Sequence, residues 1–319
     1  MSKIQIRNIE VDPGEKIFGY LPVAETPTYT VKLPCGIVNG TNPGLTVSII
    51  AGLHPTEYCG MEAATRLFQQ ISPTDVSGAL LITPVVNIPG FQVAADHVNP
   101  LDGLNLNRIF PGDPVGSISQ RMIHVLFDEV IRLADVHLDL HSGEAIEAVP
   151  HYAIIPNTGT ELDEESANLA RIYAPHLNQI SGQPGTSTQE ASMRLKIPAI
   201  TAEAGGLGNY DEIDINFHLT GLINVLKYLK ILPGHPSTIN ATPEIFTGSQ
   251  SVRASRGGIF YPFVAEGAQV NEGQSLAQIK NIEGDVLETM HSPVQGLVGM
   301  FRPKRVKNSG DLAYIIWTS

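Results

Sequence analysis

The amino-acid sequence predicts an α/β fold with a mostly parallel or mixed sheet between helices, followed by a smaller all-β domain. From Leu45 onward, short apolar runs of strand length alternate with longer segments of helical period, a pattern typical of parallel strands covered by helices. After about Thr247 the chain changes to short β-like stretches separated by glycine-containing turns. Because 42% of the 319 residues are apolar and only 16% are charged, the chain can bury a sizeable core, and disorder is excluded as its dominant state.

Each element of the first domain is predicted from its local pattern. The strand candidates are the apolar runs 46–51, 79–85, 136–140, 152–155 and 199–203. The segments of helical period are 57–70, 117–133 and 211–229. The helix at 117–133 begins with Ser117 and has Gln120 three residues later, which is the pairing of a capping box.

The change of pattern along the chain predicts two domains. We expect residues 1–240 to form the first domain, in which residues 1–44 are an N-terminal β segment, and residues 246–319 to form the second. The segment 235–245 is rich in proline, threonine and serine and is therefore predicted to be the linker between them.

Charge and cysteine content limit the class of protein. With 32 acidic against 20 basic residues the formal net charge is -12, which argues against nucleic acid as a partner. Cys35 and Cys59 form no C-x-x-C pair, so we expect neither a disulfide framework nor a cysteine zinc knuckle, and a reducing cytoplasm fits. The N-terminal residues carry charges throughout, and no uncharged apolar run approaches the roughly 18 residues of a membrane span, so we expect no signal peptide and no membrane partner.

Two strand ends carry the candidate metal ligands. The strand predicted at 46–51 leads to His54, and Glu57 follows three residues later at the start of a helix. The strand predicted at 136–140 leads to His141 in a D-x-H sequence. Ligand sites in open α/β sheets lie outside the carboxyl ends of strands. Two close ligands with a distant third are typical of catalytic zinc sites, which leave one position open for water, so the set predicts one bound metal ion.

The same residue types also occur in roles that need no such metal set. A lone H-x-x-E is more often a hydrogen-bonded histidine and a surface glutamate than a metal site. His137, Asp139 and His141 alternate on one strand face and could form a set of their own, but they would span about 13 Å at roughly 3.3 Å per residue. Asp139 could instead support the site or be a solvated or capping residue, and Cys59 fits a small buried helix residue better than a ligand.

A water molecule activated by a metal also needs a general base, and Glu203 is the candidate. It ends the β-like run 199–203, where an unpaired carboxylate in the core would be costly. Next to a metal, the same carboxylate can accept the proton of the water and pass it to a leaving amine. The alternative is a structural glutamate paired with an arginine.

The long loop 88–116 between the two metal-binding segments is predicted to be functional. Loops of this length are usually functional or disordered, and this one contains too many apolar residues for disorder. Asn107 and Arg108 in this loop offer an amide and a planar guanidinium, which suit a substrate carboxylate. An ordinary salt bridge is the alternative for Arg108.

Taken in order, these residues resemble the succinylglutamate desuccinylase/aspartoacylase family of zinc hydrolases. The family motifs G-x-H-x-x-E, L-N-R-x-F, D-x-H and a Glu with Gly after it are matched in sequence order, and the resemblance covers most of the chain. It implies a catalytic domain like that of zinc carboxypeptidases, with one Zn²⁺ per chain. It also implies that the zinc ligands are His54, Glu57 and His141. The implied general acid/base is Glu203, and the implied carboxylate-binding pair is Asn107 and Arg108.

The chain departs from the family pattern at two positions. Many relatives have an arginine upstream of the Asn-Arg pair that polarises the scissile carbonyl, but residues 94–103 contain none, and His97 is the candidate substitute. Relatives often have Asp two residues before the Asn, where this chain has Asn105, which removes a charge from near the metal.

The C-terminal part resembles the β-barrel-sandwich module of the same family, which is itself similar to biotinyl and lipoyl carriers. Carrier modules present a modified lysine at a hairpin tip, but the corresponding region here, 283–290, has no lysine. We therefore expect the module to serve as a lid or an oligomer contact rather than as a swinging arm, and we expect a homo-oligomer.

Together these observations predict a cytoplasmic zinc-dependent hydrolase that releases an acyl group from an N-acyl amino acid or a similar small amide. The sequence lacks a G-x-S-x-G motif, a Walker A motif and a G-x-G-x-x-G motif after a strand, so serine hydrolases, P-loop proteins and dinucleotide-binding proteins are not supported. Two alternatives stay open. One is a carboxypeptidase-like peptidase with the same metal ligands, and the other is a metal-free binding protein that retains the fold.

Overall fold

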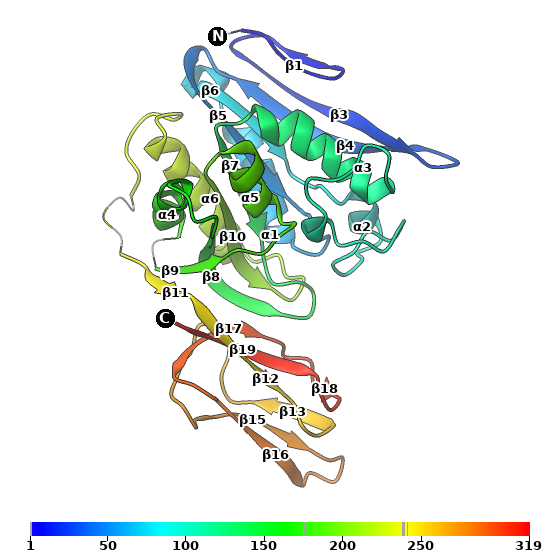
Figure 1. Ribbon diagram of the computed structural model, residues 1–319, viewed down its shortest axis with the longest axis vertical. Coiled ribbons are helices and arrows are strands. Elements are labelled where there is room, and N and C mark those ends of the chain that lie inside the picture. The colour runs from blue at the N-terminus through cyan, green and yellow to red at the C-terminus, as the bar shows by residue number, and fades with distance from the viewer. Residues whose placement is uncertain (1, 175, 238–239, 241) are drawn as a thin grey trace.

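A computed structural model describes residues 2–174, 176–237, 240 and 242–319 (Figure 1). The α/β part lies at one end of an elongated molecule, and the C-terminal strands lie at the other end. Residues 238, 239 and 241 of the predicted linker lie outside the described residues. Among the described helices, none is both long and apolar enough to cross a membrane.

The central sheet of the α/β part is mixed. Its strands are β3 (Glu15–Glu25), β4 (Thr30–Asn39), β5 (Asn42–Ala51), β6 (Ser77–Thr83), β7 (Val136–His141), β8 (Ala148–Pro156), β9 (Leu177–Ser181) and β10 (Ala199–Gly206). A short antiparallel pair, β1 (Ile4–Ile6) and β2 (Ile9–Val11), precedes them. Every strand predicted in this part is present, and β3 and β4 lie within the segment 1–44 that was predicted to be β-structure.

Strand directions in this sheet follow a simple division. The strands β6, β5, β7 and β10 are neighbours in this order and are parallel to one another. The flanking strands are antiparallel: β4 pairs with β6, and β8 pairs with β10. The carboxyl ends of the parallel strands therefore lie at the same edge of the sheet, which is the edge that carries the predicted site residues.

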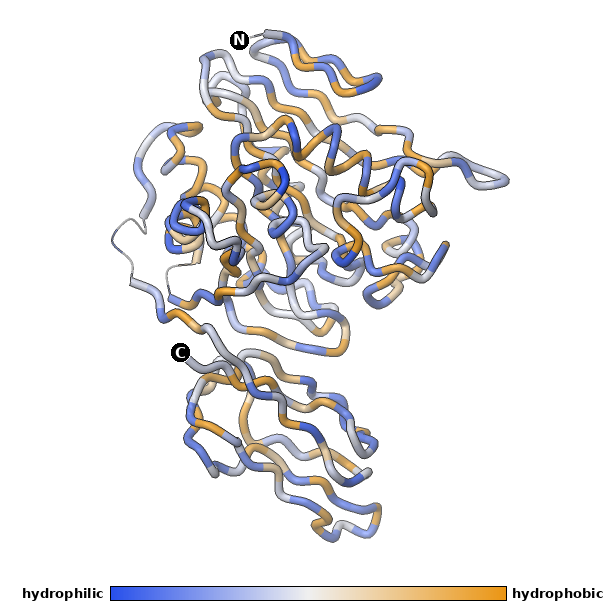
Figure 2. The backbone as a smooth tube through the Cα atoms, viewed as in Figure 1, coloured by the Kyte–Doolittle hydropathy of each residue, from blue (hydrophilic) through white to orange (hydrophobic). Residues whose placement is uncertain are grey.

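Helices cover both faces of the sheet. They are α1 (Tyr58–Gln70), α2 (Ile88–Gln92), α3 (Ile118–Val125), α4 (Leu162–Tyr173), α5 (Ser187–Glu190) and α6 (Glu212–Tyr228). One face packs against α1, α4 and α6 through buried aliphatic residues such as Leu67, Leu169 and Leu222. The other face packs against α3 and the β1–β2 pair. In Figure 2, hydrophobic and hydrophilic residues alternate along these helices and strands.

The helix predicted at 117–133 is regular only in its first half. Ser117 and Gln120 form the predicted capping box, with the Gln120 side chain accepting from Ser117 N at 2.9 Å. The α-helix ends at Val125, and the chain continues as a π-turn (Leu126–Val130) and a 3₁₀ turn (Ile131–Leu133). Helix α4 was not predicted from the sequence, although its Leu169, Ala170, Ile172 and Tyr173 are buried at helical spacing.

The C-terminal part is all-β, as predicted. Its strands are β11 (Glu244–Phe246), β12 (Gly248–Arg253), β13 (Gly258–Pro262), β14 (Gln269–Val270), β15 (Ser275–Lys280), β16 (Val286–His291), β17 (Gly296–Phe301), β18 (Val306–Lys307) and β19 (Leu312–Thr318). Most pair antiparallel around a core that includes Phe260, Leu276 and Tyr314. The hairpin between β15 and β16 is the lysine-free region that the sequence singled out.

The two parts are joined by strand pairing. Strand β17 contacts β8 through the pair Phe301 and Ala148, so the central sheet continues into the C-terminal strands. The indole of Trp317 packs against the ring of Tyr152 with centroids 4.5 Å apart. Since β8 also borders the site strand β10, the C-terminal part is held close to the predicted site.

Candidate metal centre and active site

The predicted metal ligands come from two neighbouring strand ends. After β5 the chain turns at Gly52, where φ is +67°, and reaches His54 and then Glu57 immediately before α1. His141 is the last residue of β7. Helix α1 can approach β7 closely because residue 60 is glycine, where a Cβ atom would lie 2.9 Å from Leu140 Cβ. This close approach brings Glu57 to His141.

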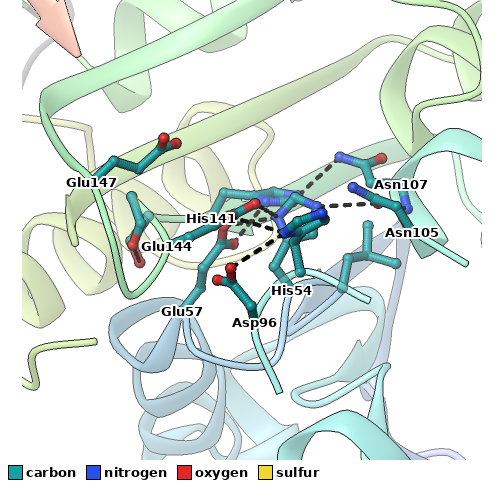
Figure 3. Close-up of polar contacts among 12 residues, drawn as sticks. His54, Glu57, Asp96, Asn105, Asn107, His141, Glu144 and Glu147 are labelled. Atoms are coloured by element: carbon teal, nitrogen blue, oxygen red, sulfur yellow. Dashed lines mark hydrogen bonds and ion pairs between the residues drawn. The ribbon is translucent and has the colours of Figure 1, made fainter. Parts of the chain in front are cut away.

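The three side chains meet around the carboxylate of Glu57 (Figure 3). Nδ1 of His54 lies 2.8 Å from Glu57 Oε1, and Nδ1 of His141 lies 2.8 Å from Glu57 Oε2. One possible ligand atom from each residue lies within 4.8 Å of the other two, and all three residues are buried. The structure therefore brings the predicted set together.

The outer nitrogens of both imidazoles are held by oxygen acceptors. Nε2 of His141 lies 3.1 Å from Asp139 Oδ2, and Nε2 of His54 lies 3.3 Å from Asn105 Oδ1. Such acceptors place the ring proton on Nε2 and leave the Nδ1 lone pair directed inward. Asp139 and Asn105 therefore occupy the positions of supporting residues around the set.

The donor set fits a divalent cation. Two imidazole nitrogens and a carboxylate are ligands that zinc accepts in catalytic sites. Oε2 of Glu57 is buried and has no hydrogen-bond partner of acceptable geometry among the described residues, although His141 Nδ1 is close. Because an orphaned carboxylate oxygen is costly in a protein interior, its direction toward the two imidazoles is best explained by a shared cation.

The surroundings of Glu57 and Glu203 shift the pKa values of these two glutamates in opposite directions. Burial alone would raise the pKa of Glu57, but the imidazoles of His141 and His54 outweigh it and lower the pKa to about 2. Burial raises the pKa of Glu203 well above its usual range, Glu57 and Glu147 add to the effect, and His141 opposes it. Glu57 is therefore held as an anion, whereas Glu203 holds a proton readily.

The competing set on one strand face is not assembled. His137 Nδ1 pairs with Ser48 Oγ at 2.6 Å, and burial lowers the pKa of His137 to about 4 despite the opposing charge of Asp139. Among the described residues, no group that could hold a metal includes His137. Cys59 is buried, and its Sγ lies 3.5 Å from Asn209 O, which fits a small packed helix residue.

A cavity of about 240 Å³ opens at this edge of the sheet. It is lined by the predicted residues His54, Glu57, Asn107, Arg108, His141 and Glu203. It is also lined by residues that the sequence did not single out, including Glu144, Glu147, Tyr152, Thr188, Thr201 and Met300. Met300 belongs to β17, so the C-terminal part supplies a portion of the cavity wall.

Glu203 lies directly beside a ligand strand. In the parallel pairing of β10 with β7, Glu203 is the register partner of His141. Its side chain lines the cavity and is only partly buried. The pairing therefore places residue 203 beside His141, and the side chains of both residues line the cavity.

The predicted substrate-binding residues differ in placement. Asn107 is buried, its Oδ1 accepts from Ser187 N at 3.0 Å, and its Nδ2 lies 3.4 Å from His141 Nε2. Arg108 is exposed to the cavity, with Nη1 donating to Asn107 O at 2.6 Å. His97 is not among the described residues that line the cavity. Its side chain is 47% exposed, and its Nδ1 lies 3.5 Å from Glu144 Oε2.

The loop after His141 carries two further glutamates. Glu147 is bound by Arg302 of the C-terminal part, with distances of 2.9 Å to Nε and 2.8 Å to Nη2. Glu144 Oε1 lies 4.0 Å from His54 Nδ1, and burial raises the pKa of Glu144. Both glutamates lie close in sequence to the D-x-H motif, but no pattern in the sequence shows that this loop folds back over the cavity.

The sequence matches a family described as the succinylglutamate desuccinylase/aspartoacylase catalytic domain over residues 43–229, more than half of the chain. A relative over nearly the whole length is the N-alpha-acetyl-L-2,4-diaminobutyric acid deacetylase of Halomonas elongata. It is 27% identical over 324 residues, covering 97% of this chain and 93% of the relative.

Solved structures match over the same extent. The succinylglutamate desuccinylase/aspartoacylase from Rhodobacter sphaeroides is 26% identical, with a TM-score of 0.85 and coverage of 95% of both chains. The product-bound ectoine utilization protein EutE (DoeB) from Ruegeria pomeroyi is 24% identical, with a TM-score of 0.88 and coverage of 98% of both chains. The fold therefore extends through the C-terminal β part in these proteins as well.

Proposed function

Because the chain belongs to the succinylglutamate desuccinylase/aspartoacylase family, we propose that it is a zinc-dependent deacylase acting on N-acyl amino acids or similar small amides. The observation that carries this proposal is the convergence of His54, Glu57 and His141 at the floor of a small cavity. The relative named as a deacetylase supports hydrolysis of a linear amide. We place the catalytic machinery in residues 1–240 and treat residues 246–319 as a module that closes one side of the cavity.

The chain's own residues would hold one zinc ion through Nδ1 of His54, Nδ1 of His141 and the carboxylate of Glu57. When bound, zinc supplies Lewis acidity, which lowers the pKa of water and polarises a carbonyl oxygen. Asp139 and Asn105 fix the orientation of the two imidazoles by accepting from their Nε2 protons.

Glu203 is the proposed proton carrier. Its carboxylate accepts a proton from the attacking water and donates that proton to the nitrogen of the departing amine. Burial raises the pKa of this carboxyl well above its usual range, which helps it to take up the proton and to hold it until the amine departs. Its position beside His141 keeps the proton close to the reacting atoms.

Arg108 and Asn107 are the proposed carboxylate-binding pair. Among the described residues, the Arg108 guanidinium donates one hydrogen bond, from Nη1 to the carbonyl of Asn107, so other N–H groups can face the cavity. If Nε2 of His141 donates to Asp139, it cannot accept from Asn107 as well, which leaves Asn107 Nδ2 free to donate to a substrate. His97 stays a candidate for contact with the acyl carbonyl only if the loop around it moves.

The cavity favours a small substrate over a polypeptide. Its volume is about 240 Å³, and Met300 and the Arg302–Glu147 ion pair bring the C-terminal part against it. A peptidase would need a groove that continues beyond the cavity on both sides of the scissile bond. The proposal therefore prefers deacylation to the peptidase alternative.

A substrate screen tests this proposal. The zinc-loaded protein is assayed against N-acetyl, N-succinyl and N-formyl amino acids and against short unblocked peptides, with Glu203→Gln prepared in parallel to reveal contaminating hydrolases. We expect release of free amino acid from at least one acyl series by the wild type and a large loss in the variant. Turnover of peptides alone would favour the peptidase, and binding without turnover in any series would favour a binding protein.

A further inference from the structure

The side chain of Tyr152 stands in one row with those of Glu203 and His141. Strand β10 lies between β7 and β8, and its Glu203 is the register partner of His141 on β7 and of Tyr152 on β8. Register partners on neighbouring strands point to the same face of a sheet. All three residues line the cavity. Tyr152 therefore presents its side chain to the cavity beside the proposed base, two strands away from a proposed metal ligand.

The hydroxyl of Tyr152 has no partner within the described part of the chain. Only 6% of this residue is exposed, and its hydroxyl makes no hydrogen bond to any residue that the structure describes. The hydroxyl oxygen is not one of the fully enclosed polar atoms that lack a partner, so it opens to the cavity. Because a buried tyrosine hydroxyl normally finds a hydrogen-bond partner, this one is available to a ligand.

Three other hydroxyl groups that line the cavity are engaged within the protein. Thr188 Oγ1 pairs with Thr201 Oγ1 at 3.1 Å. Ser142 Oγ donates to the backbone oxygen of the next residue at 3.1 Å. The hydroxyl of Tyr152 differs from these in that a substrate does not have to displace a bond within the protein to reach it.

Apolar packing holds the ring of Tyr152 in place. The indole of Trp317 lies against it with ring centroids 4.5 Å apart and an angle of 61° between the planes. Val149 and Leu297 belong to the same buried cluster. Since the ring is fixed by these contacts, the direction of its hydroxyl is set before a substrate binds. A donor fixed in this way stabilises developing charge without a cost of reorganisation.

The hydroxyl of Tyr152 keeps its proton at neutral pH. Burial raises the pKa of Tyr152 well above its usual range, and the charges of Glu203, Glu147 and Glu57 add to this effect. The group is therefore a hydrogen-bond donor rather than a phenolate. Negative charge that develops on a substrate oxygen within its reach would be stabilised by this donor.

We propose that Tyr152 is a catalytic residue whose hydroxyl donates a hydrogen bond to the acyl carbonyl oxygen of the substrate as this oxygen becomes negatively charged. The inference rests on the proposed deacylase function and adds a residue to its machinery. Glu203 must reach the water that attacks the carbonyl, and Tyr152 flanks Glu203 in the same row. The reacting carbonyl is therefore the substrate group that lies beside this hydroxyl.

The electrons and protons of the reaction balance without a proton from Tyr152. Attack of the water oxygen on the acyl carbon moves the π-electron pair of the C=O bond onto the carbonyl oxygen, while Glu203 takes a proton of the water. When this electron pair returns, the C–N bond breaks and the amine leaves with the proton from Glu203. Tyr152 donates a hydrogen bond in both steps and keeps its own proton.

This assignment needs no movement of the loop around His97. The side chain of His97 is 47% exposed, and His97 is not among the described residues that line the cavity. Tyr152 lies in the cavity wall in the structure as it stands. The two residues can therefore be compared directly as candidates for contact with the carbonyl.

The test is Tyr152→Phe in the zinc-loaded, full-length protein. This change removes the hydroxyl and keeps the ring that packs against Trp317. The substrate is the acyl amino acid that the wild type hydrolyses fastest. The probe is its phosphonyl analogue, in which a tetrahedral phosphorus with two oxygens replaces the acyl carbon, because such a compound resembles the transition state in shape and charge.

We expect kcat to fall by about 10²-fold, as for the loss of one donor to a developing oxyanion, with little change in KM. The inhibition constant of the phosphonyl analogue should rise by about the same factor as kcat/KM falls. The inhibition constant of the product amino acid, the zinc content and the shape of the pH profile of kcat/KM should stay as in the wild type, because Glu203 is intact.

Tyr314→Phe is the matched control. Tyr314 is also buried, but its hydroxyl donates to Val264 O at 3.2 Å and to Leu276 O at 3.0 Å in the C-terminal core. The variant loses the same atom in another place, so it should keep the wild-type kcat and the wild-type affinity for the analogue, whatever its stability.

Three outcomes overturn the inference while leaving the deacylase function intact. The first is a Tyr152→Phe variant with wild-type kcat, including one in which KM alone rises. The second is a fall in kcat with unchanged affinity for the analogue, and a shifted pH profile would then show that Tyr152 acts through Glu203. The third is a loss of analogue affinity in His97→Ala with none in Tyr152→Phe. Failure of the wild type to hydrolyse any acyl amino acid would instead contradict the proposed function itself.

Discussion

The α/β part and the C-terminal β part bury different kinds of side chain. At the site edge of the α/β sheet, buried polar or ionisable residues include His54, Glu57, Asp139 and His141. In residues 246–319 the buried polar side chains are Ser292 and Lys307, and the core is aliphatic and aromatic. The two parts of the chain thus differ in how many polar and ionisable side chains they bury.

The difference extends to how buried polar atoms are satisfied. In the C-terminal part, Lys307 Nζ donates to two backbone carbonyls at 2.8 and 3.1 Å, and Ser292 Oγ donates to Val294 O at 2.6 Å. Near the site edge, by contrast, Glu57 Oε2 and Asp139 Oδ1 are buried without a hydrogen-bond partner among the described residues. Unsatisfied buried groups lower stability, so the two carboxylate oxygens beside the imidazoles indicate a place organised for chemistry rather than for stability.

The largest effect is expected from Glu203. Glu203→Gln retains the shape of the side chain but cannot accept the proton of water, so kcat should fall by about 10²–10⁴-fold while zinc remains bound. Steady-state kinetics and metal analysis of the same sample check this. A variant with wild-type kcat would make Glu203 a structural residue. The polar side chains at the site edge would then lack the proposed chemical role.

A core substitution in the C-terminal part tests whether its apolar core contributes to stability rather than to chemistry. Phe260 is fully buried among apolar neighbours, so Phe260→Ala should lower the free energy of unfolding of this part by about 3–5 kcal/mol. Denaturant unfolding followed by the fluorescence of Trp317 measures the loss. At a temperature where the variant is folded, kcat/KM should stay within a few-fold of the wild type. A large loss of kcat in the folded variant would mean that the C-terminal part takes part in the chemistry.

A smaller effect is expected from Arg108. Arg108→Lys keeps the positive charge but loses the planar two-pronged geometry, so KM should rise by about tenfold with little change in kcat. The substrate analogue with a carboxamide in place of the carboxylate provides the control, because it should be a poor substrate of both proteins. If the variant discriminates between acid and amide as well as the wild type does, Arg108 does not bind the carboxylate.

The smallest effect concerns acid stability, where the two parts should again differ. His218 of α6 is buried, its Nε2 donates to His141 O at 3.0 Å, and burial lowers the pKa of His218 to about 3. Below about pH 6.5 the unfolded chain binds a proton at this residue, whereas the folded chain does not. The contribution of His218 to the free energy of unfolding is therefore fully present above that pH. It decreases at lower pH by up to about 1.4 kcal/mol per pH unit.

Urea unfolding of the metal-free protein between pH 7.5 and 5 measures this slope. His218→Gln should be less stable at pH 7.5 but should lose less stability on acidification than the wild type. His291 is exposed on β16 in the C-terminal part, so His291→Gln is the matched control and should leave the slope unchanged. Equal slopes for His218→Gln and the wild type would show that His218 does not contribute to acid unfolding.

The meeting of His54, Glu57 and His141 could be predicted from the sequence because local pattern determines where each side chain lies. A buried strand followed by His54 and Glu57, and another followed by His141, place side chains at one edge whenever the strands are parallel neighbours. Apolar runs indicate strands but not their direction, so the antiparallel pairing of β8 with β10 was not specified. The end of α3 at Val125 was also missed, because the apolar period continues through the turns that follow.

The walls of the cavity were much harder to predict. Met300 and Arg302 reach the site from more than 150 residues beyond Glu147, through the pairing of β17 with β8. Glu144 lies in a short loop whose path depends on that packing. Long-range contacts of this kind leave no periodic signal in a single sequence. The residues of the cavity walls are therefore less predictable than the proposed metal ligands.

Metal content in three proteins tests the central claim most directly. Wild type, His141→Ala and His137→Ala are loaded with zinc, dialysed, and analysed for metal per chain together with deacylase activity. We predict one zinc ion per chain in the wild type, loss of most of that zinc and of activity in His141→Ala, and near-wild-type zinc in His137→Ala, because His137 pairs with Ser48 outside the set. Full zinc and full activity in His141→Ala would contradict the assignment of His54, Glu57 and His141 as the metal centre.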